Sequence, residues 1–207
     1  MPAGNGLARG PAPATVLGPR RRHADRLNHP EPPPFGASIV TLLHPQNELG
    51  VHLRWMIRRD MPEVVGIERE AFEFPWSDED FTRCLRQRNC IGMVGEIADS
   101  VVAFMIYELQ RTRLHVLNFA VLRSHRRLGI GSHMLRKLTG KLSADHRSRV
   151  LLEVRETNLP AQLFFRSHGF RAVSVLKDFY QDTTEDAYLM EYLLDAAPAA
   201  LPRRMAG

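Results

Sequence analysis

The segment Arg126-Arg127-Leu128-Gly129-Ile130-Gly131-Ser132 lies between a predicted strand and a predicted amphipathic helix. At such a junction, the amides of the loop and of the first helical turn have no partner inside the helix. A phosphate group can accept hydrogen bonds from them, and the helix dipole favours its negative charge. Gly129 and Gly131 let the backbone approach a ligand closely, and Arg126 and Arg127 add charge-assisted contacts. The segment predicts a phosphate-binding loop, or else a glycine turn that only opens a helix.

Two common nucleotide-binding motifs do not fit this loop. It contains no Gly-Lys-Ser or Gly-Lys-Thr, which excludes a P-loop, and it lacks the third glycine of the dinucleotide fingerprint. The ligand class therefore has to come from the rest of the chain.

The flanking sequence predicts an α/β domain. Apolar periodicity and capping residues give strands over 53–58, 92–97, 101–109, 114–122, 150–155, 172–179 and 187–194, and helices over 61–72, 77–88, 131–142 and 160–167. Strands 114–122 and 150–155 are joined by a helix, so we expect them to be parallel neighbours. The order of elements predicts a mixed sheet with helices on both faces.

Composition separates a central domain, residues 51–197, from two tails that we expect to be disordered. These tails are residues 1–50, rich in Pro, Gly, Ala and Arg, and residues 198–207. The chain has a net charge of +5, yet residues 59–197 hold 19 basic and 20 acidic residues. The core is therefore not expected to bind nucleic acid specifically. The basic tails are expected to be solvated, with contact to a polyanion such as ribosomal RNA as the alternative.

Cysteine and histidine spacing gives no sign of a metal site. Cys84 and Cys90 fit neither a redox pair nor a zinc site, so we expect reduced packing thiols, with a reactive thiol as the alternative. His125, His133 and His168 form no ligand pattern with acidic residues. No stretch reaches the ~18 apolar residues of a membrane span. No apolar segment follows the early arginines as in a secretory signal. We expect a cytoplasmic protein without metal or membrane contact.

Several motifs occur in the order and spacing of the GNAT acetyltransferases. They are Asn118-Phe119-Ala120-Val121, the loop 126–132, Leu152-Glu153-Val154-Arg155-Glu156-Thr157-Asn158, Gly169-Phe170 and Glu185-Asp186-Ala187. With Ala71-Phe72-Glu73-Phe74-Pro75-Trp76-Ser77 upstream, they resemble the RimI-type N-terminal protein acetyltransferases over about residues 53–195. The resemblance implies the GNAT fold: a mixed sheet of about six to seven strands that splays apart between the fourth and fifth. It also implies acetyl-CoA as co-substrate.

By this resemblance, acetyl-CoA would lie along one strand and the loop. Phe119, Ala120 and Val121 would line the acetyl-pantetheine arm, and one backbone N–H would donate to the thioester carbonyl. The loop would hold the pyrophosphate, with the side chains of Arg126 and Arg127 adding to its amides. Asn158 would contact coenzyme A, cap the helix that starts near Pro160, or do both.

Glu153 matches the family's general base, with a solvent-facing strand residue as the alternative. An α-amine has a pKa near ~8, so a carboxylate needs to do only modest work. Phe165 departs from the pattern, because the family has a tyrosine there that acts as the acid. Coenzyme A would then leave as a thiolate, Tyr180 of the predicted substrate loop would replace the acid, or activity is reduced. Tyr180 is equally interpreted as a packing or substrate-contact residue.

Three functions remain open at this point. The first is acetylation of a protein N-terminal α-amine, which the resemblance implies to be an alanine on a small-subunit ribosomal protein. Acidic residues near the predicted substrate loop would attract a basic tail; they are Asp178, Asp182, Glu185 and Asp186. The second is acetylation of a lysine or a small amine; a lysine, with a pKa of ~10.4, needs a stronger base. The third is a weakly active acetyl-CoA-binding module. No feature of the sequence fixes the oligomeric state.

Overall fold

A computed structural model of the chain describes residues 50–143, 146–180 and 182–194. The two predicted tails lie outside these residues apart from Gly50, as do the last three residues of the predicted domain. The strands are β1 (His52–Trp55), β2 (Cys90–Ile97), β3 (Ser100–Leu109), β4 (Arg113–Val121), β5 (Arg149–Arg155), β6 (Arg171–Tyr180) and β7 (Glu185–Leu193). The α-helices are α1 (Met61–Ala71), α2 (Asp78–Leu85), α3 (Ile130–Thr139) and α4 (Leu159–Ser167). Two short 3-10 helices, η1 (Arg58–Asp60) and η2 (Arg123–His125), complete the elements.

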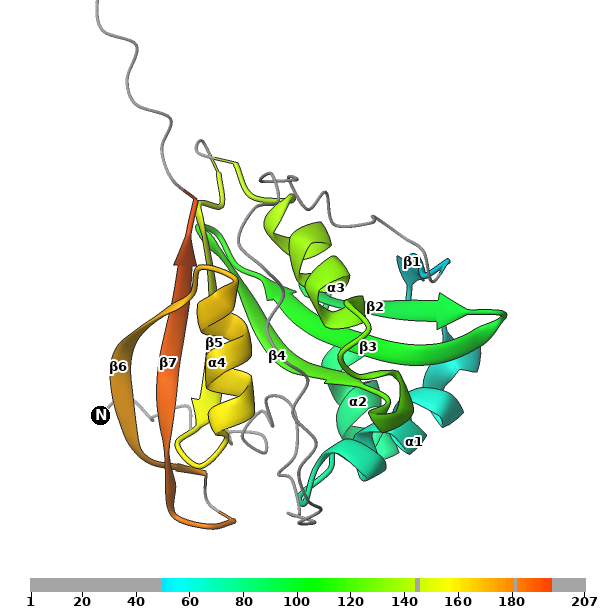
Figure 1. The fold of residues 1–207 in the computed structure, drawn as a ribbon, viewed down its shortest axis with the longest axis horizontal. Helices are drawn as coiled ribbons and strands as arrows, with labels where there is room; N and C mark the ends of the chain where they lie inside the picture. The colour runs from blue at the N-terminus through cyan, green and yellow to red at the C-terminus, as the bar shows by residue number, and fades with distance from the viewer. Residues whose placement is uncertain (1–49, 144–145, 181, 195–207) are drawn as a thin grey trace, which may run out of the picture.

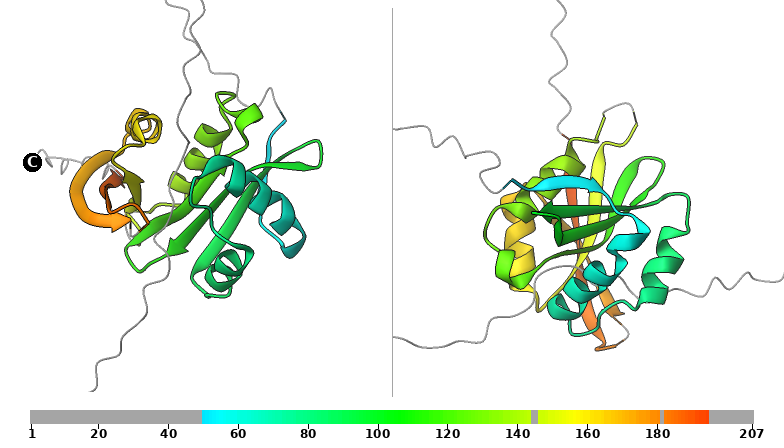
Figure 2. Two further views of the ribbon diagram at one scale, coloured as in Figure 1. Left: turned by 90° about the horizontal axis from the view of Figure 1, so that it is seen from below. Right: turned by 90° about the vertical axis from the view of Figure 1, so that its right-hand side faces the viewer.

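The seven strands form one mixed sheet in the order β1-β2-β3-β4-β5-β7-β6. Neighbouring strands are antiparallel except β4 and β5, which are parallel, as predicted. Helices α1 and α2 lie on one face of the sheet, and α3 and α4 lie on the other (Figure 1, Figure 2). The expected mixed sheet with helices on both faces is confirmed.

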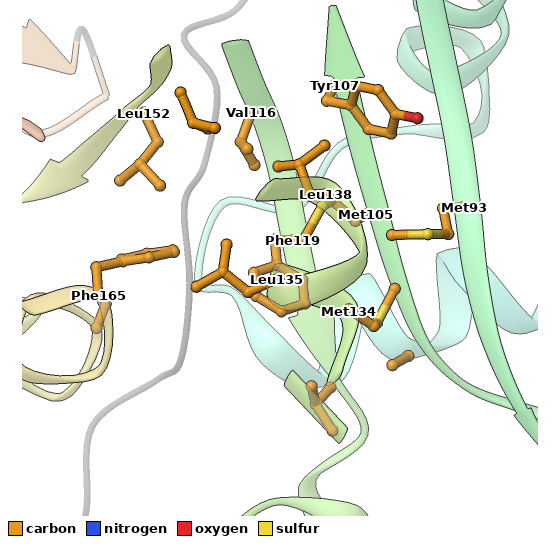
Figure 3. Close-up of a cluster of buried hydrophobic side chains, with 14 of the residues drawn as sticks. Met93, Met105, Tyr107, Val116, Phe119, Met134, Leu135, Leu138, Leu152 and Phe165 are labelled. Atoms are coloured by element: carbon orange, nitrogen blue, oxygen red, sulfur yellow. The ribbon is translucent and has the colours of Figure 1, made fainter. Parts of the chain in front are cut away.

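Each face of the sheet has its own apolar core. On one side, Met134, Leu135 and Leu138 of α3 pack with strand residues and with Phe165 of α4 (Figure 3). On the other, Val64 and Phe81 belong to a core that joins α1 and α2 to β2, β3 and β4. Burial of these apolar side chains is the main stabilising contribution. The sheet therefore separates two compartments, and alternate residues of a strand point into different ones.

Strands β4 and β5 diverge along their length (Figure 1). They pair only from Arg113 opposite Arg149 to Val116 opposite Leu152, although β4 continues to Val121. The divergence begins at a bulge, because Ile106 of β3 pairs with Asn118 and Tyr107 pairs with Val116, which leaves Leu117 as an extra residue. A bulge bends its strand and increases the local twist. The expected splay between the fourth and fifth strands is confirmed.

Most predicted elements are present, with changes at their ends. Ser77 and Asp80 form a capping box, with Ser77 Oγ accepting from the Asp80 amide at 3.2 Å and Asp80 Oδ2 accepting from the Ser77 amide at 3.0 Å. Asp60 occupies the predicted cap position of α1, but its carboxylate accepts from the Ile57 amide and pairs with Arg54 instead. This contact stabilises η1, so the first strand ends at Trp55 rather than at residue 58.

Candidate functional site

The predicted phosphate loop lies between η2 and α3 and has an unusual backbone. Arg127 and Gly129 have φ angles of 68° and 82°, in the left-handed region that favours glycine. Helix α3 begins directly afterwards, and the first amide with a helical partner is that of His133, which donates to the Gly129 carbonyl at 2.9 Å. Within the described residues, no backbone carbonyl accepts from the amides of residues 127–132. The loop thus presents a set of N–H donors at a helix start, as an anion site requires.

The two glycines of the loop do different work. Nothing lies within 4 Å of a side chain added at Gly129, so only its dihedral angles call for glycine. A Cβ on Gly131 would lie 3.2 Å from Cζ of Phe164 and 3.4 Å from Cζ of Phe119. Gly131 therefore lets the first turn of α3 pack against these two rings.

The side chain of Arg126 joins the loop to strand β4. Its Nε donates to the Val121 carbonyl at 2.9 Å, which ties the loop to the last residue of β4. Burial lowers the pKa of Arg126, and the nearby charge of Arg123 acts in the same direction. Its Nη2 is buried and has no partner among the described residues. The contact with Val121 gives Arg126 a structural role, and its predicted contact with a phosphate stays a prediction.

The end of β4 offers an unpaired backbone edge next to this loop. Residues 119–121 pair with β3 on one side, while the ladder to β5 has ended at Val116. A strand edge of this kind can accept an extended ligand by backbone hydrogen bonds. The donor loop and the strand edge together fit a long molecule with a phosphate group at one end and an extended arm at the other, such as acetyl-CoA.

Glu153 contacts a histidine that the sequence interpretation did not select. Its neighbours Leu152 and Val154 pack in the core beside α3 and α4, so alternation places Glu153 on the opposite face of β5. Glu153 is only 6% exposed. His115 Nε2 lies 3.0 Å from its Oε1 and 2.9 Å from its Oε2. The alternative of a solvent-facing strand residue does not fit this burial.

The pair can accept a proton. When Nε2–H of a neutral imidazole donates to the carboxylate, the lone pair of Nδ1 is left as the acceptor. One sequence signal could have found His115. It alternates with the core residues Leu114 and Val116 in β4, which places it on the same face as Glu153 of the adjacent strand.

Tyr180, the proposed substitute acid, lies at the end of β6 beside Arg155. The ring of Tyr180 is 1% exposed, and the Arg155 guanidinium lies 3.8 Å from its centroid. Its hydroxyl is buried without a partner among the described residues. Burial raises the pKa of Tyr180 above its usual value; Arg155 opposes this shift, and Glu153 adds to it. A phenol with a raised pKa is a poor proton donor to a thiolate, whose conjugate thiol has a pKa of only ~8.5.

The acidic residues near Tyr180 are largely neutralised. Arg155 pairs with Asp182 at 2.7 Å and with Glu185 at 3.0 Å. Asp186 pairs with Lys177, and the two groups shift each other's pKa in the direction that keeps both charged. Attraction of a basic tail by this stretch is therefore weaker than its sequence indicates.

Phe165 and Asn158, from α4 and its start, have clear packing roles. Phe165 is 0% exposed and lies in the same core as Phe119 (Figure 3), with the two ring centroids 6.5 Å apart. The ring centroid of Phe170 lies 5.3 Å from that of Phe165. Asn158 Oδ1 accepts from the Ala161 amide at 3.2 Å, which confirms its predicted capping role. Its contact with coenzyme A stays a prediction.

The described residues also show the state of the two cysteines and bear on metal sites and membrane-spanning helices. Cys84 and Cys90 are buried and not joined by a disulfide. No cluster of three or more histidine, cysteine or acidic side chains suited to a metal ion occurs in the described part of the chain. Among its helices, none is both long and apolar enough to cross a membrane.

Comparison with known proteins agrees with this geometry. A family model described as the acetyltransferase (GNAT) family matches residues 61–170, more than half of the chain. An N-alpha-acetyltransferase of Sulfurisphaera tokodaii is 30% identical over 144 residues, which cover 63% of this chain and 86% of the relative. The ribosomal protein bS18 alanine N-acetyltransferase of Escherichia coli is 29% identical over 133 residues, which cover 63% and 89%. The crystal structure of the ribosomal-protein-S18-alanine N-acetyltransferase from Escherichia coli matches with a TM-score of 0.65 and 25% identity, covering 73% of this chain and 98% of that one. The chain therefore belongs to the acetyltransferase (GNAT) family.

Proposed function

We propose that this protein transfers the acetyl group of acetyl-CoA to the N-terminal α-amine of a protein. The observation that carries the proposal is the contact between His115 and Glu153, which lies where the β4–β5 ladder ends. The two side chains would act as a proton acceptor next to the unpaired edge of β4, along which the acetyl-pantetheine arm would lie. Similarity to N-alpha-acetyltransferases supports an α-amine as the acceptor.

Binding of acetyl-CoA would use main-chain groups above all. The amides of residues 127–132 would donate to the pyrophosphate, with the side chain of Arg127 adding charge. Phe119, Ala120 and Val121 would pair with the arm through their backbone, and one N–H would donate to the thioester carbonyl. Acetyl-CoA supplies the activated acetyl group, and the chain itself has to position the amine and remove its proton.

The proton of the acceptor α-amine would be removed by His115 and Glu153 acting together. An α-amine with a pKa near ~8 is mostly protonated at neutral pH, and only its neutral form can attack the thioester. His115 Nδ1 would accept the proton, directly or through a water. Glu153 would hold the imidazole in the tautomer that leaves Nδ1 free, and would stabilise the imidazolium that forms.

Coenzyme A is proposed to leave as a thiolate. Phe165 has no proton to give, and burial makes Tyr180 a weak acid. A thiol pKa of ~8.5 makes the thiolate a tolerable leaving group without a dedicated acid. Tyr180 would then act as a wall of the acceptor site beside Arg155.

The acceptor is proposed to be an N-terminal alanine on a small-subunit ribosomal protein, modified in the cytoplasm. Support comes from the similarity to the bS18 alanine N-acetyltransferase of Escherichia coli. An acceptor lysine would need a stronger base, because its pKa of ~10.4 lies further above neutrality.

The test compares peptides in a thiol-release assay with acetyl-CoA. One set begins with a free alanine, and a matched set is blocked at the N-terminus and contains lysine. Release with the free N-termini alone is expected. Release with lysine alone would contradict the proposal, and acetyl-CoA binding without release from any peptide would point to a binding module.

A further inference from the structure

Arg155 contacts two segments that are far apart in the sequence. It follows Glu153 by two residues, so its side chain leaves β5 on the face that carries Glu153 and His115. Its guanidinium lies 5.4 Å from the ring centroid of Phe74, in the segment between α1 and α2. It also lies 3.8 Å from the ring centroid of Tyr180, at the start of the β6–β7 connection. One side chain thus touches both segments on the face of β5 that carries the proposed proton acceptor, and we take both to lie on the acceptor side.

The contacts of Arg155 with the β6–β7 connection are directional. Its Nη1 donates to Thr183 Oγ1 at 2.8 Å and to Glu185 Oε2 at 3.0 Å. Its Nη2 donates to Asp182 Oδ2 at 2.7 Å. The side chain is 17% exposed, and burial works against its charge, but the two carboxylates outweigh burial and raise the pKa of Arg155. A planar fork fits this set of acceptors in a way that an ammonium cannot.

The same network reaches the segment that follows β5. Glu185 Oε1 accepts from the Thr157 amide at 2.9 Å and from the Thr157 hydroxyl. Thr157 precedes Asn158, the cap of α4. The β6–β7 connection is therefore bound at two nearby places, by the side chain of Arg155 and by Thr157. Of these two residues, only Arg155 contacts Phe74 within the described part of the chain.

We propose that Arg155 is a positioning residue that joins the two acceptor-side segments, so that they recognise the acceptor peptide as one unit. The inference rests on the proposed acetyl transfer to a protein N-terminus. Among the described residues, no hydrogen bond or cation–π contact joins the Arg155 side chain to the loop 127–132, so replacing this side chain is expected to affect the acceptor more than acetyl-CoA. The planar guanidinium does the joining, and a positive charge alone does not suffice.

The first experiment separates acceptor binding from the other steps. Arg155→Lys and Arg155→Met are each expected to raise the KM for an alanine peptide at least 10-fold, with the KM for acetyl-CoA and kcat changing less than 3-fold. Arg149→Lys is the matched control, because Arg149 lies on the same strand and pairs with Glu191 at 3.0 Å, far from the site. An unchanged peptide KM in the Arg155 variants, or equal changes in all three parameters, would overturn the inference.

A second experiment tests the joining itself and needs no activity. Phe74 is 40% exposed, so Phe74→Leu is expected to fold. In a wild-type background this change should speed amide hydrogen exchange in residues 182–185, and in an Arg155→Lys background it should have no such effect. An equal effect in both backgrounds, or none in either, would refute the coupling. Should no peptide be acetylated, the proposed function fails, while the exchange result still judges the role of Arg155.

Discussion

His115 of β4 and Glu153 of β5 meet through a two-pronged contact, with Nε2 lying 3.0 Å and 2.9 Å from the two carboxylate oxygens. The contact crosses the only parallel pair of strands in the described sheet, next to its last paired residues. The histidine and the glutamate are 38 positions apart in the sequence, and the pairing of β4 with β5 brings them into contact.

Replacement of Glu153 by glutamine should slow the chemical step. Glutamine keeps the size of the side chain but cannot hold an imidazolium, so kcat should fall on the order of 10²–10⁴-fold. The Kd for acetyl-CoA should stay within a few-fold, because Glu153 lies on the opposite side of β5 from the core beside α3. Thiol release and calorimetry measure the two quantities. Glu191→Gln, on the neighbouring strand, serves as control, and an unchanged kcat in Glu153→Gln would remove this residue from the mechanism.

His115 should be as important as Glu153, and the two effects should not add. If they act as one acceptor, removing either member removes most of the function of both. We expect His115→Asn to lower kcat to within about 10-fold of the Glu153→Gln value, with the double variant close to the slower single variant. Rate losses that multiply in the double variant would mean that the residues act independently.

Gly129 should be intolerant of a side chain even though space is available. Its φ of 82° costs a residue with a Cβ about 1–2 kcal/mol, so Gly129→Ala should lower stability and weaken acetyl-CoA binding. Gly66→Ala in α1 is the matched control. Its Cβ meets nothing within 4 Å and its φ is not positive, so it should stabilise the protein by up to ~1 kcal/mol. Equal effects of the two alanines on acetyl-CoA affinity would contradict the role of the loop.

The sequence predicted the sheet, the parallel pair and the position of the loop, because these follow from local periodicity and from the short connections of the chain. Asn158 as a helix cap was equally accessible, since capping needs only three neighbouring residues. His115 and the contacts of Arg155 were not predicted. The first depends on the register of β4 against β5, in which His115 is paired with Leu151, two residues before Glu153. The second depends on how the segment with Phe74 and the β6–β7 connection pack against β5. Alternation within β4 indicates the face on which His115 lies, but it does not reveal which residue of β5 the histidine contacts.

Phe165→Tyr tests whether the enzyme lacks an acid. The ring is 0% exposed and packs against other aromatic rings, so a hydroxyl without a partner should cost about 1–3 kcal/mol in the free energy of unfolding. Because coenzyme A is proposed to leave as a thiolate, kcat should change less than 3-fold. A rise in kcat of more than 10-fold would show instead that the missing hydroxyl limits the rate.

Glu68 should make the stability of the fold depend on pH. It is 0% exposed, and its Oε1 accepts from the Trp76 amide at 2.8 Å and from Asn118 Nδ2 at 3.1 Å. Its Oε2 is buried without a partner among the described residues. Burial raises the pKa of Glu68 to about 7, which outweighs both hydrogen bonds. The folded protein therefore binds this proton more tightly than the unfolded chain does.

This difference in proton affinity makes the folded protein less stable, relative to the unfolded chain, as the pH rises. The contribution of the Glu68 proton to the free energy of unfolding is fully present below pH 4.5, the ordinary pKa of glutamate. It is lost as the pH rises through about 7, the pKa in the folded protein. The loss amounts to about 3 kcal/mol at most. Glu68→Gln mimics the protonated acid, so its stability relative to wild type should increase across this pH range, as measured by urea unfolding at pH 5, 6, 7 and 8. Glu73→Gln, an exposed residue of the adjacent segment, controls for the change in net charge. Parallel curves for Glu68→Gln and wild type would show that folding does not raise the pKa of Glu68, and that its hydrogen bonds with the Trp76 amide and Asn118 Nδ2 offset the effect of burial.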